Sequence, residues 1–148
     1  MLTTYNKKEY KCFPESDRAV LLTSNEQVDS TWVGYKRGSS IRYEKMVLKS
    51  ECGKFYNINC YGYYKGQAIE IINVEGNRVR VMGSEGVYTE EFIKTVLGGK
   101  RGRDLEVWCD SSIFSDFEMR YTENGEVTKI VKGVSLEQVR EKVKRSFY

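Results

Sequence analysis

Apolar and polar residues alternate most regularly between positions 67 and 82. The run AIEIINVEGNRVRVM predicts two β-strands joined by a two-residue turn at Gly76-Asn77. The expected cross-strand pairs are Val74 with Val79, Ile72 with Val81, Asn73 with Arg80 and Glu75 with Arg78. The first two pairs are apolar and the other two are polar. The pattern therefore predicts a hairpin with one buried and one solvated face.

A second hairpin is predicted in FEMRYTENGEVTKIVK, residues 117–132. Its centre, Asn124-Gly125, is the strongest short signal for a hairpin turn. The residues expected on one face are Phe117, Met119 and Tyr121, with Ile130 opposite Met119.

A helix is expected to begin after this hairpin, at Ser135. Gln138 completes a capping box with Ser135, and Val134 can contact Val139 across the helix start. The expected apolar stripe consists of Leu136, Val139, Val143 and Phe147.

Residues 85–96, EGVYTEEFIKTV, fit two different structures. In the first, Thr89 caps a short helix with an apolar side formed by Phe92, Ile93, Val96 and Leu97. In the second, a tight turn leads into a final strand. The spacing of Gly86, Phe92, Ile93 and Val96 resembles the closing motif of bacterial Src-homology-type barrels, with Thr89 near the usual proline. We favour the second interpretation.

The first part of the chain resembles a diverged copy of the second. Residues 5–24 can be aligned with 63–84, since both begin Tyr-x-Lys and continue as strand, acidic turn and strand. We therefore expect a mainly β (α+β) protein with one or two small Src-homology-like barrels. The expected modules are 1–58 and 59–99, each β, followed by 100–148 as a hairpin plus C-terminal helix packed with the rest as one compact unit.

Composition limits the chemistry available to this chain. It has 148 residues, 40% hydrophobic and 30% charged, which is an ordinary globular balance. It has no histidine, so the serine–histidine and cysteine–histidine nucleophile arrangements are excluded. We expect a binding protein rather than an enzyme, with no cofactor and no metal.

The cysteines and the apolar runs indicate a cellular compartment. Cys12, Cys52, Cys60 and Cys109 form no C-x-x-C pair, so a zinc ribbon is not indicated. The first residues show no signal-peptide pattern, and no apolar run approaches the ~20 residues that cross a bilayer. We expect four reduced thiols, no disulfide, no membrane contact and a cytoplasmic location.

Two charged clusters have ordinary explanations. The loop GGKRGR at 98–103 lacks the spacing of a phosphate-binding loop and is expected to be a solvated connector. The acidic residues around Trp108 are Asp104, Glu106, Asp110 and Asp116, and they fit a strand with a charged outer face. The net charge of +3 is too small to imply a nucleic-acid partner by itself.

Aromatic and basic residues outside the expected core are the candidate binding residues. Tyrosine and tryptophan are favoured at protein interfaces because they combine a large apolar surface with a polar tip. The partner-binding candidates are Trp32, Tyr35, Tyr61, Tyr63, Arg101 and Arg103.

One stretch resembles a known group of proteins. KMVLKSECGKFYNINCYGYYKG, residues 45–66, is similar to a pattern Lys-x-Val-x-Lys-Ser-Glu, Tyr-x-Ile and Tyr-Lys-Gly in small Gram-positive proteins. Those proteins look like immunity partners of polymorphic or contact-dependent toxins. The resemblance covers about the first 95 residues and implies stoichiometric binding and neutralisation of a cognate toxin domain. The alternative is a Src-homology-like module that binds peptide or nucleic acid, including a phage- or plasmid-encoded protein that acts on host defence.

Overall fold

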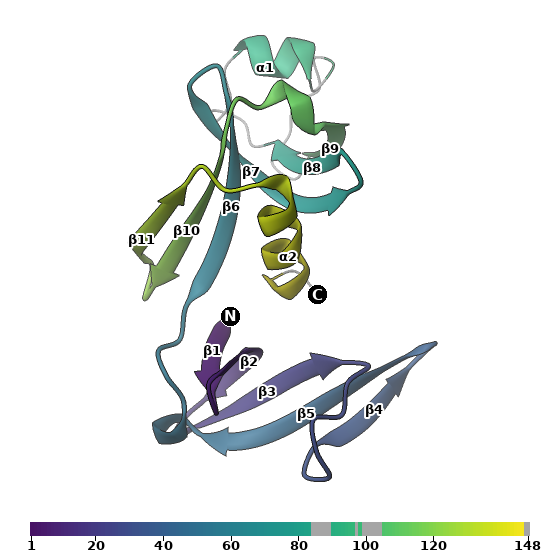
Figure 1. Ribbon diagram of the computed structural model, residues 1–148, viewed down its shortest axis with the longest axis vertical. Coiled ribbons are helices and arrows are strands. Elements are labelled where there is room, and N and C mark those ends of the chain that lie inside the picture. Colours follow the sequence, from purple (N-terminus) through teal and green to yellow (C-terminus); the bar gives the residue numbers. More distant parts are fainter. Residues whose placement is uncertain (84–89, 97, 99–104, 147–148) are drawn as a thin grey trace. The chain divides into compact units, whose positions relative to one another are not determined.

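The computed structural model in Figure 1 describes residues 1–83, 90–96, 98 and 105–146. The chain divides into two compact units, Met1–Asn57 and Ile58–Tyr148, and each contains its own β-sheet. Strands account for most of the described residues, and a helix follows the last strand. The expected mainly β class with a C-terminal helix is confirmed.

The first unit is a five-stranded antiparallel sheet with the order β1-β2-β3-β5-β4. Its strands are β1 (Leu2–Tyr5), β2 (Lys8–Glu15), β3 (Arg18–Ser24), β4 (Val33–Arg37) and β5 (Ser40–Leu48). A short 3-10 helix, η1 (Lys49–Glu51), follows β5. The chain then returns along β1, where the backbone N–H groups of Leu2 and Tyr56 each donate to the other residue's carbonyl.

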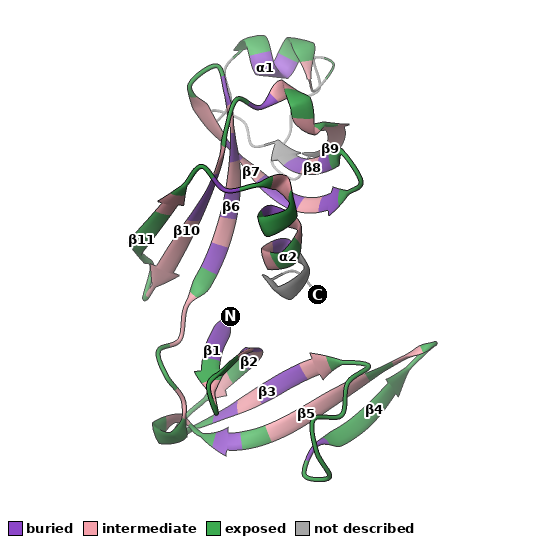
Figure 2. Cartoon of the chain, in the orientation of Figure 1, coloured by how far each residue is buried: buried purple, intermediate pink, exposed green. Residues whose placement is uncertain are grey.

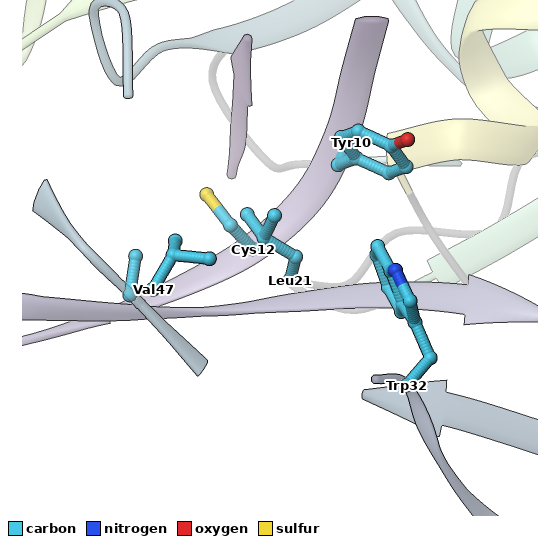
Figure 3. Packing of buried hydrophobic residues seen from close by; sticks show 6 residues of the cluster. Tyr10, Cys12, Leu21, Trp32 and Val47 are labelled. Carbon is cyan, nitrogen blue, oxygen red and sulfur yellow. The ribbon is translucent and has the colours of Figure 1, made fainter. Parts of the chain in front are cut away.

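The core of the first unit lies on one side of this sheet (Figure 3). Its buried residues are Tyr10, Cys12, Ala19, Leu21, Trp32 and Val47. Tyr5, Tyr43, Cys52 and Phe55 pack against this cluster and cover part of it. Most of the apolar core of the first unit therefore lies under one face of its sheet, whereas Leu2 and Leu22 are buried on the other face.

The second unit is a six-stranded sheet with the order β11-β10-β6-β7-β8-β9. Its strands are β6 (Asn57–Tyr64), β7 (Gln67–Glu75), β8 (Arg78–Gly83), β9 (Leu105–Asp110), β10 (Phe117–Glu123) and β11 (Glu126–Lys132). The short helices are η2 (Ser111–Ile113), α1 (Glu90–Thr95) and α2 (Leu136–Ser146), and α2 contacts β7 and β10. Strands from 59–99 and from 100–148 thus share one sheet, since β9 pairs with β8 and β10 lies beside β6.

The prediction of a strand within residues 85–96 is wrong, because Glu90–Thr95 form the helix α1. Phe92 and Ile93 are adjacent and both buried, whereas adjacent residues of a strand would face opposite sides. The backbone N–H of Val96 donates to the carbonyl of Phe92, as in a helix. Gly86 and Thr89, the other residues of the expected motif, lie outside the described residues.

The described strands do not close the small barrels that we expected. Each sheet ends on two strands that do not pair with each other: β1 and β4 in the first, β11 and β9 in the second. For the second module, the barrel expectation depended on a final strand in 85–96, and the structure has a helix at Glu90–Thr95.

The predicted registers are correct near the turns and wrong beyond them. In the first hairpin, three of the expected pairs form, Val74–Val79, Asn73–Arg80 and Glu75–Arg78. A bulge then places Ile71, not Ile72, opposite Val81, and both isoleucines are buried. In the second, Asn124-Gly125 forms the turn, but a bulge beside Tyr121 places Val131 rather than Ile130 opposite Met119.

The start of α2 matches its sequence signal. The N–H of Ser135 donates to Gln138 Oε1 at 2.8 Å, and the N–H of Gln138 donates to Ser135 Oγ at 3.1 Å. Val134, Val139 and Val143 are buried. The capping box and the apolar stripe therefore determine where this helix begins and which side packs on the sheet.

Candidate functional site: an exposed apolar sheet face

One side of the first sheet carries large apolar side chains that are open to solvent. We call this surface the apolar face, and its exposed members are Phe13, Val33, Tyr35, Met46 and Leu48. Between 43% and 56% of the surface of each of these residues is exposed. Figure 2 shows β4 exposed along its whole length.

Strand register places these side chains next to one another. Phe13 of β2 lies opposite Val20 of β3, and Val20 lies opposite Met46 of β5. These three residues form a row across the sheet, because directly opposed side chains point to the same face. Val33 and Tyr35 extend the surface along β4, the outermost strand.

The core on the other side of the sheet explains why these residues are exposed. Val47 is 6% exposed and belongs to the core, so its neighbours Met46 and Leu48 point away from it. Cys12 is fully buried, and its neighbour Phe13 points outward for the same reason. Isolated exposed apolar residues are normal, but a contiguous set is typical of an interaction surface.

Cationic side chains outnumber carboxylates around the apolar face. The cations on this side are Lys11, Arg18, Arg37 and Arg42, and the carboxylates are Glu9, Glu15 and Glu44. Partial burial, and then the charge of Arg42, lowers the pKa of Lys11. This neighbourhood of like charges would favour an acidic surface on any partner.

Arg42 uses only part of its hydrogen-bonding capacity. Its Nη2 lies 2.8 Å from Glu44 Oε1, whereas its Nε is buried and has no hydrogen-bond partner among the described residues. A guanidinium group can bind a carboxylate with two parallel N–H donors. Arg42 is therefore held at Nη2 by Glu44, and its unpaired Nε is not open to solvent.

Of the predicted binding residues, Tyr35 is exposed and Trp32 is not. Tyr35 is 50% exposed and belongs to the apolar face, whereas Trp32 is 3% exposed. Its indole packs on the ring of Tyr10, as Figure 3 shows. The two ring centroids are 5.3 Å apart. The expectation that Trp32 is an exposed anchor is therefore wrong. Burial of this large apolar ring stabilises the fold more than exposure would.

Tyr61 and Tyr63 lie together on one face of β6 and contact charged residues of β10. The Tyr63 hydroxyl donates to Glu118 Oε1 at 2.9 Å, and the guanidinium of Arg120 lies 4.1 Å from the ring centroid of Tyr61. Arg120 Nε is 2.6 Å from Glu118 Oε2. Both tyrosines are half-buried within this network, so a structural role accounts for them.

The carboxylate of Glu118 is held in its charged form by its neighbours. Burial opposes ionisation, but hydrogen bonds from Arg120 and Tyr63 and the charges of Arg120 and Lys132 outweigh it. The pKa of Glu118 is therefore below its usual value. Only 1% of the residue is exposed. A lowered pKa means that the charged form stabilises the fold at neutral pH, and that this contribution is lost as pH falls through the acidic range.

Replacing Glu118 with glutamine is expected to lower the free energy of unfolding by about 1–2 kcal/mol at neutral pH, because the hydrogen bond to a charged group is lost. The measurement is urea unfolding between about pH 6 and about pH 3. The wild-type stability should fall with pH more steeply than that of Glu118→Gln. Exposed Glu126→Gln is the matched control, and equal pH slopes for wild type and Glu118→Gln would contradict the assignment.

The remaining predictions concern two arginines, metal sites and membrane-spanning segments. Arg101 and Arg103, with most of the loop 98–103, lie outside the described residues. Among the residues that are described, no group of three or more cysteines and carboxylates is placed to hold a metal ion. None of the described helices combines the length and apolar content that a membrane-spanning helix needs.

The four cysteines are free thiols with little nucleophilic character. Burial raises the pKa of Cys12 and of Cys109 to about 11, and that of Cys60 to about 12. Burial also raises the pKa of Cys52. Thiols with such pKa values stay protonated at neutral pH, and the thiolate is the reactive form.

Sequence reasoning missed Phe13, Val33, Met46 and Leu48. A usable signal was present, because MVL at 46–48 and CF at 12–13 place apolar residues on both sides of a strand. The apolar side chains of such a strand are either buried on both of its sides or exposed to solvent on one side. The sequence of the strand does not distinguish these two cases.

Comparison with known proteins places the chain in a family. A family model described as "Uncharacterised conserved protein UCP033725" matches residues 1–98. The chain belongs to this family. The match includes the whole first unit and its apolar face, and it extends through α1 of the second unit. No curated protein and no solved structure gives a significant match.

Proposed function

We propose that this protein binds another protein stoichiometrically through the apolar face of its first sheet. The observation that carries the proposal is the contiguous surface of Phe13, Val33, Tyr35, Met46 and Leu48. Apolar anchors in such a patch supply most of the binding energy once a partner excludes water from them. The surrounding charges orient the partner and contribute less to affinity.

The proposed partner is a cognate toxin domain, and binding neutralises it. This part of the proposal is supported by the resemblance of residues 45–66 to immunity proteins. The absence of histidine from the sequence and the raised thiol pKa values favour a binding role over catalysis. The alternative, a peptide- or nucleic-acid-binding module, is distinguished by the identity of the bound molecule.

Purification of the complex from the native cell, followed by mass spectrometry and isothermal titration, tests this proposal. We expect one protein partner with one-to-one stoichiometry, and loss of that partner's activity at equimolar inhibitor. Recovery of nucleic acid instead, or of no stable one-to-one protein complex, would contradict the proposal.

Substitution of the apolar face should weaken this complex without unfolding the protein. We expect Met46→Ser to reduce affinity about 30-fold, equivalent to ~2 kcal/mol, because a central anchor is lost. The matched control is Ile130→Ser, since Ile130 is 50% exposed but lies on β11 of the second unit. If Ile130→Ser weakened the complex and Met46→Ser did not, the apolar face would be the wrong surface.

A further inference from the structure

The two edges of the first sheet differ in whether other described residues form hydrogen bonds to them. Residues 53–56 cover the outer edge of β1. The N–H of Leu2 donates to the carbonyl of Tyr56 at 2.8 Å, and the N–H of Gly53 donates to the carbonyl of Thr4 at 2.8 Å. At the other edge, no described residue outside β5 and its turn donates to or accepts from the backbone of β4. An uncovered strand edge is a template for another strand.

Hydrogen bonds around Ile41 determine which backbone groups of β4 point outward. The carbonyl of Ile41 accepts from the N–H of Asn25 at 2.7 Å, and its N–H donates to Asn25 Oδ1 at 2.8 Å. Both backbone groups of Ile41 therefore point away from β4, and its partner Lys36 belongs to a non-hydrogen-bonded pair. By alternation, the N–H and C=O groups of Lys36 and Gly34 point away from the sheet.

The side chains of β4 define what kind of segment would fit there. Val33 and Tyr35 lie on the apolar face, whereas Lys36 points to the opposite side. The strand VGYKR carries two cations and no carboxylate. An added strand with apolar residues at alternate positions would continue the apolar face, and carboxylates at the positions between them would lie beside Lys36.

We propose that the partner adds an extended segment, alternately apolar and acidic, to the outer edge of β4 as an extra strand. This inference rests on the proposed function and names its binding mode. The backbone groups of Gly34 and Lys36 pair with the added strand, and its apolar side chains pack beside Val33 and Tyr35. Strand addition of this kind takes affinity from main-chain hydrogen bonds and specificity from alternate side chains.

A defined peptide tests the binding mode without knowledge of the partner. The probe is an end-blocked, fluorescein-labelled peptide of eight alternating valine and glutamate residues, and its binding is followed by fluorescence anisotropy. A valine–lysine peptide of the same length tests the preference for acidic side chains. The same valine–glutamate peptide with methylated backbone nitrogens keeps its side chains but cannot pair as a strand.

Two substitutions of Lys36 distinguish the contribution of its backbone N–H group to peptide binding from the contribution of its charge. Lys36→Pro removes an outward N–H group and leaves the hydrogen bonds between β4 and β5, since proline is tolerated at sheet edges. Lys36→Gln removes only the charge. We expect Lys36→Gln to bind the valine–glutamate peptide within about threefold of wild type, and Lys36→Pro to bind it at least ~10-fold more weakly. Circular dichroism melting checks that Lys36→Pro folds.

The outcomes distinguish this inference from the proposed function. It is supported if wild type binds the valine–glutamate peptide more tightly than either of the other two peptides, with Lys36→Pro impaired. It is overturned if wild type binds none of the peptides. It is also overturned if wild type binds the methylated peptide or the valine–lysine peptide with the same affinity as the valine–glutamate peptide. It is also overturned if folded Lys36→Pro behaves like Lys36→Gln. The proposed function fails separately, if Met46→Ser leaves the partner complex unchanged.

Discussion

Trp32→Ala is expected to destabilise the first unit by about 3–5 kcal/mol, the usual cost of truncating a buried aromatic residue. Trp32 is 3% exposed and packs on Tyr10, so its removal leaves a cavity beside that ring. Its backbone is also fixed, because Gln27 Nε2 donates to the Trp32 carbonyl at 3.0 Å. The surrounding chain can therefore fill the space only in part. Urea unfolding followed by far-UV circular dichroism measures the loss.

Tyr35→Ala is the matched control, three residues away. Tyr35 is 50% exposed, so its removal should change the free energy of unfolding by no more than about 0.5 kcal/mol. The effect of Tyr35→Ala should appear in partner binding, and that of Trp32→Ala in stability. Equal unfolding midpoints for Trp32→Ala and wild type would mean that the indole is not part of the core.

The second large effect is expected from Gly62→Val in the second unit. A Cβ atom at position 62 would lie 2.6 Å from Cγ and Cδ1 of Phe114, which is closer than carbon atoms can approach. Phe114 is 7% exposed and lies 6.0 Å from Phe117 between ring centroids, so its ring has little room to move. We expect a loss of about 3 kcal/mol, at the upper end of the cost of overpacking.

A double-mutant cycle tests the cause of this loss. Phe114→Ala alone should cost about 3–5 kcal/mol. Combined with Gly62→Val it should cost clearly less than the sum of the two single losses, because the new side chain then occupies the vacated space. Additive losses would show that Phe114 is not what excludes a side chain at position 62.

Turns and caps could be predicted from the sequence because their determinants are local. Asn124-Gly125 forms its hairpin turn, and Ser135 and Gln138 form their capping box. The bulges that shift the register at Ile72 and Tyr121 were not predictable from local pattern. They depend on how the strand packs against its neighbours, which the residues of the strand alone do not encode.

The same distinction applies to the helix α1 and to Trp32. The segment 90–95 is too short for its apolar pattern to distinguish a strand from a helix. The helix is formed because it allows both Phe92 and Ile93 to be buried. Trp32 follows a polar loop, so local pattern favours exposure. Its burial depends on Tyr10, which lies 22 positions earlier in the sequence and packs on it in the fold.

The candidate surface could be predicted only in part for a similar reason. Tyr35 was predicted as a binding residue, but its neighbours on the apolar face were not. Phe13 and Met46 lie 33 positions apart and are joined only through Val20 of the strand between them. Which side of the sheet receives the core depends on where Trp32, Cys52 and Phe55 pack. That information is absent from any single strand.

Hydrogen–deuterium exchange of the purified partner complex tests the central claim most directly. Binding through the apolar face predicts slower exchange, relative to the free protein, in peptides that contain β4 and the adjacent strand β5. Exchange in β11 of the second unit should be unchanged, although Val127 and Ile130 are equally exposed there. Protection confined to the second unit, with β4 and β5 exchanging as in the free protein, would contradict the account.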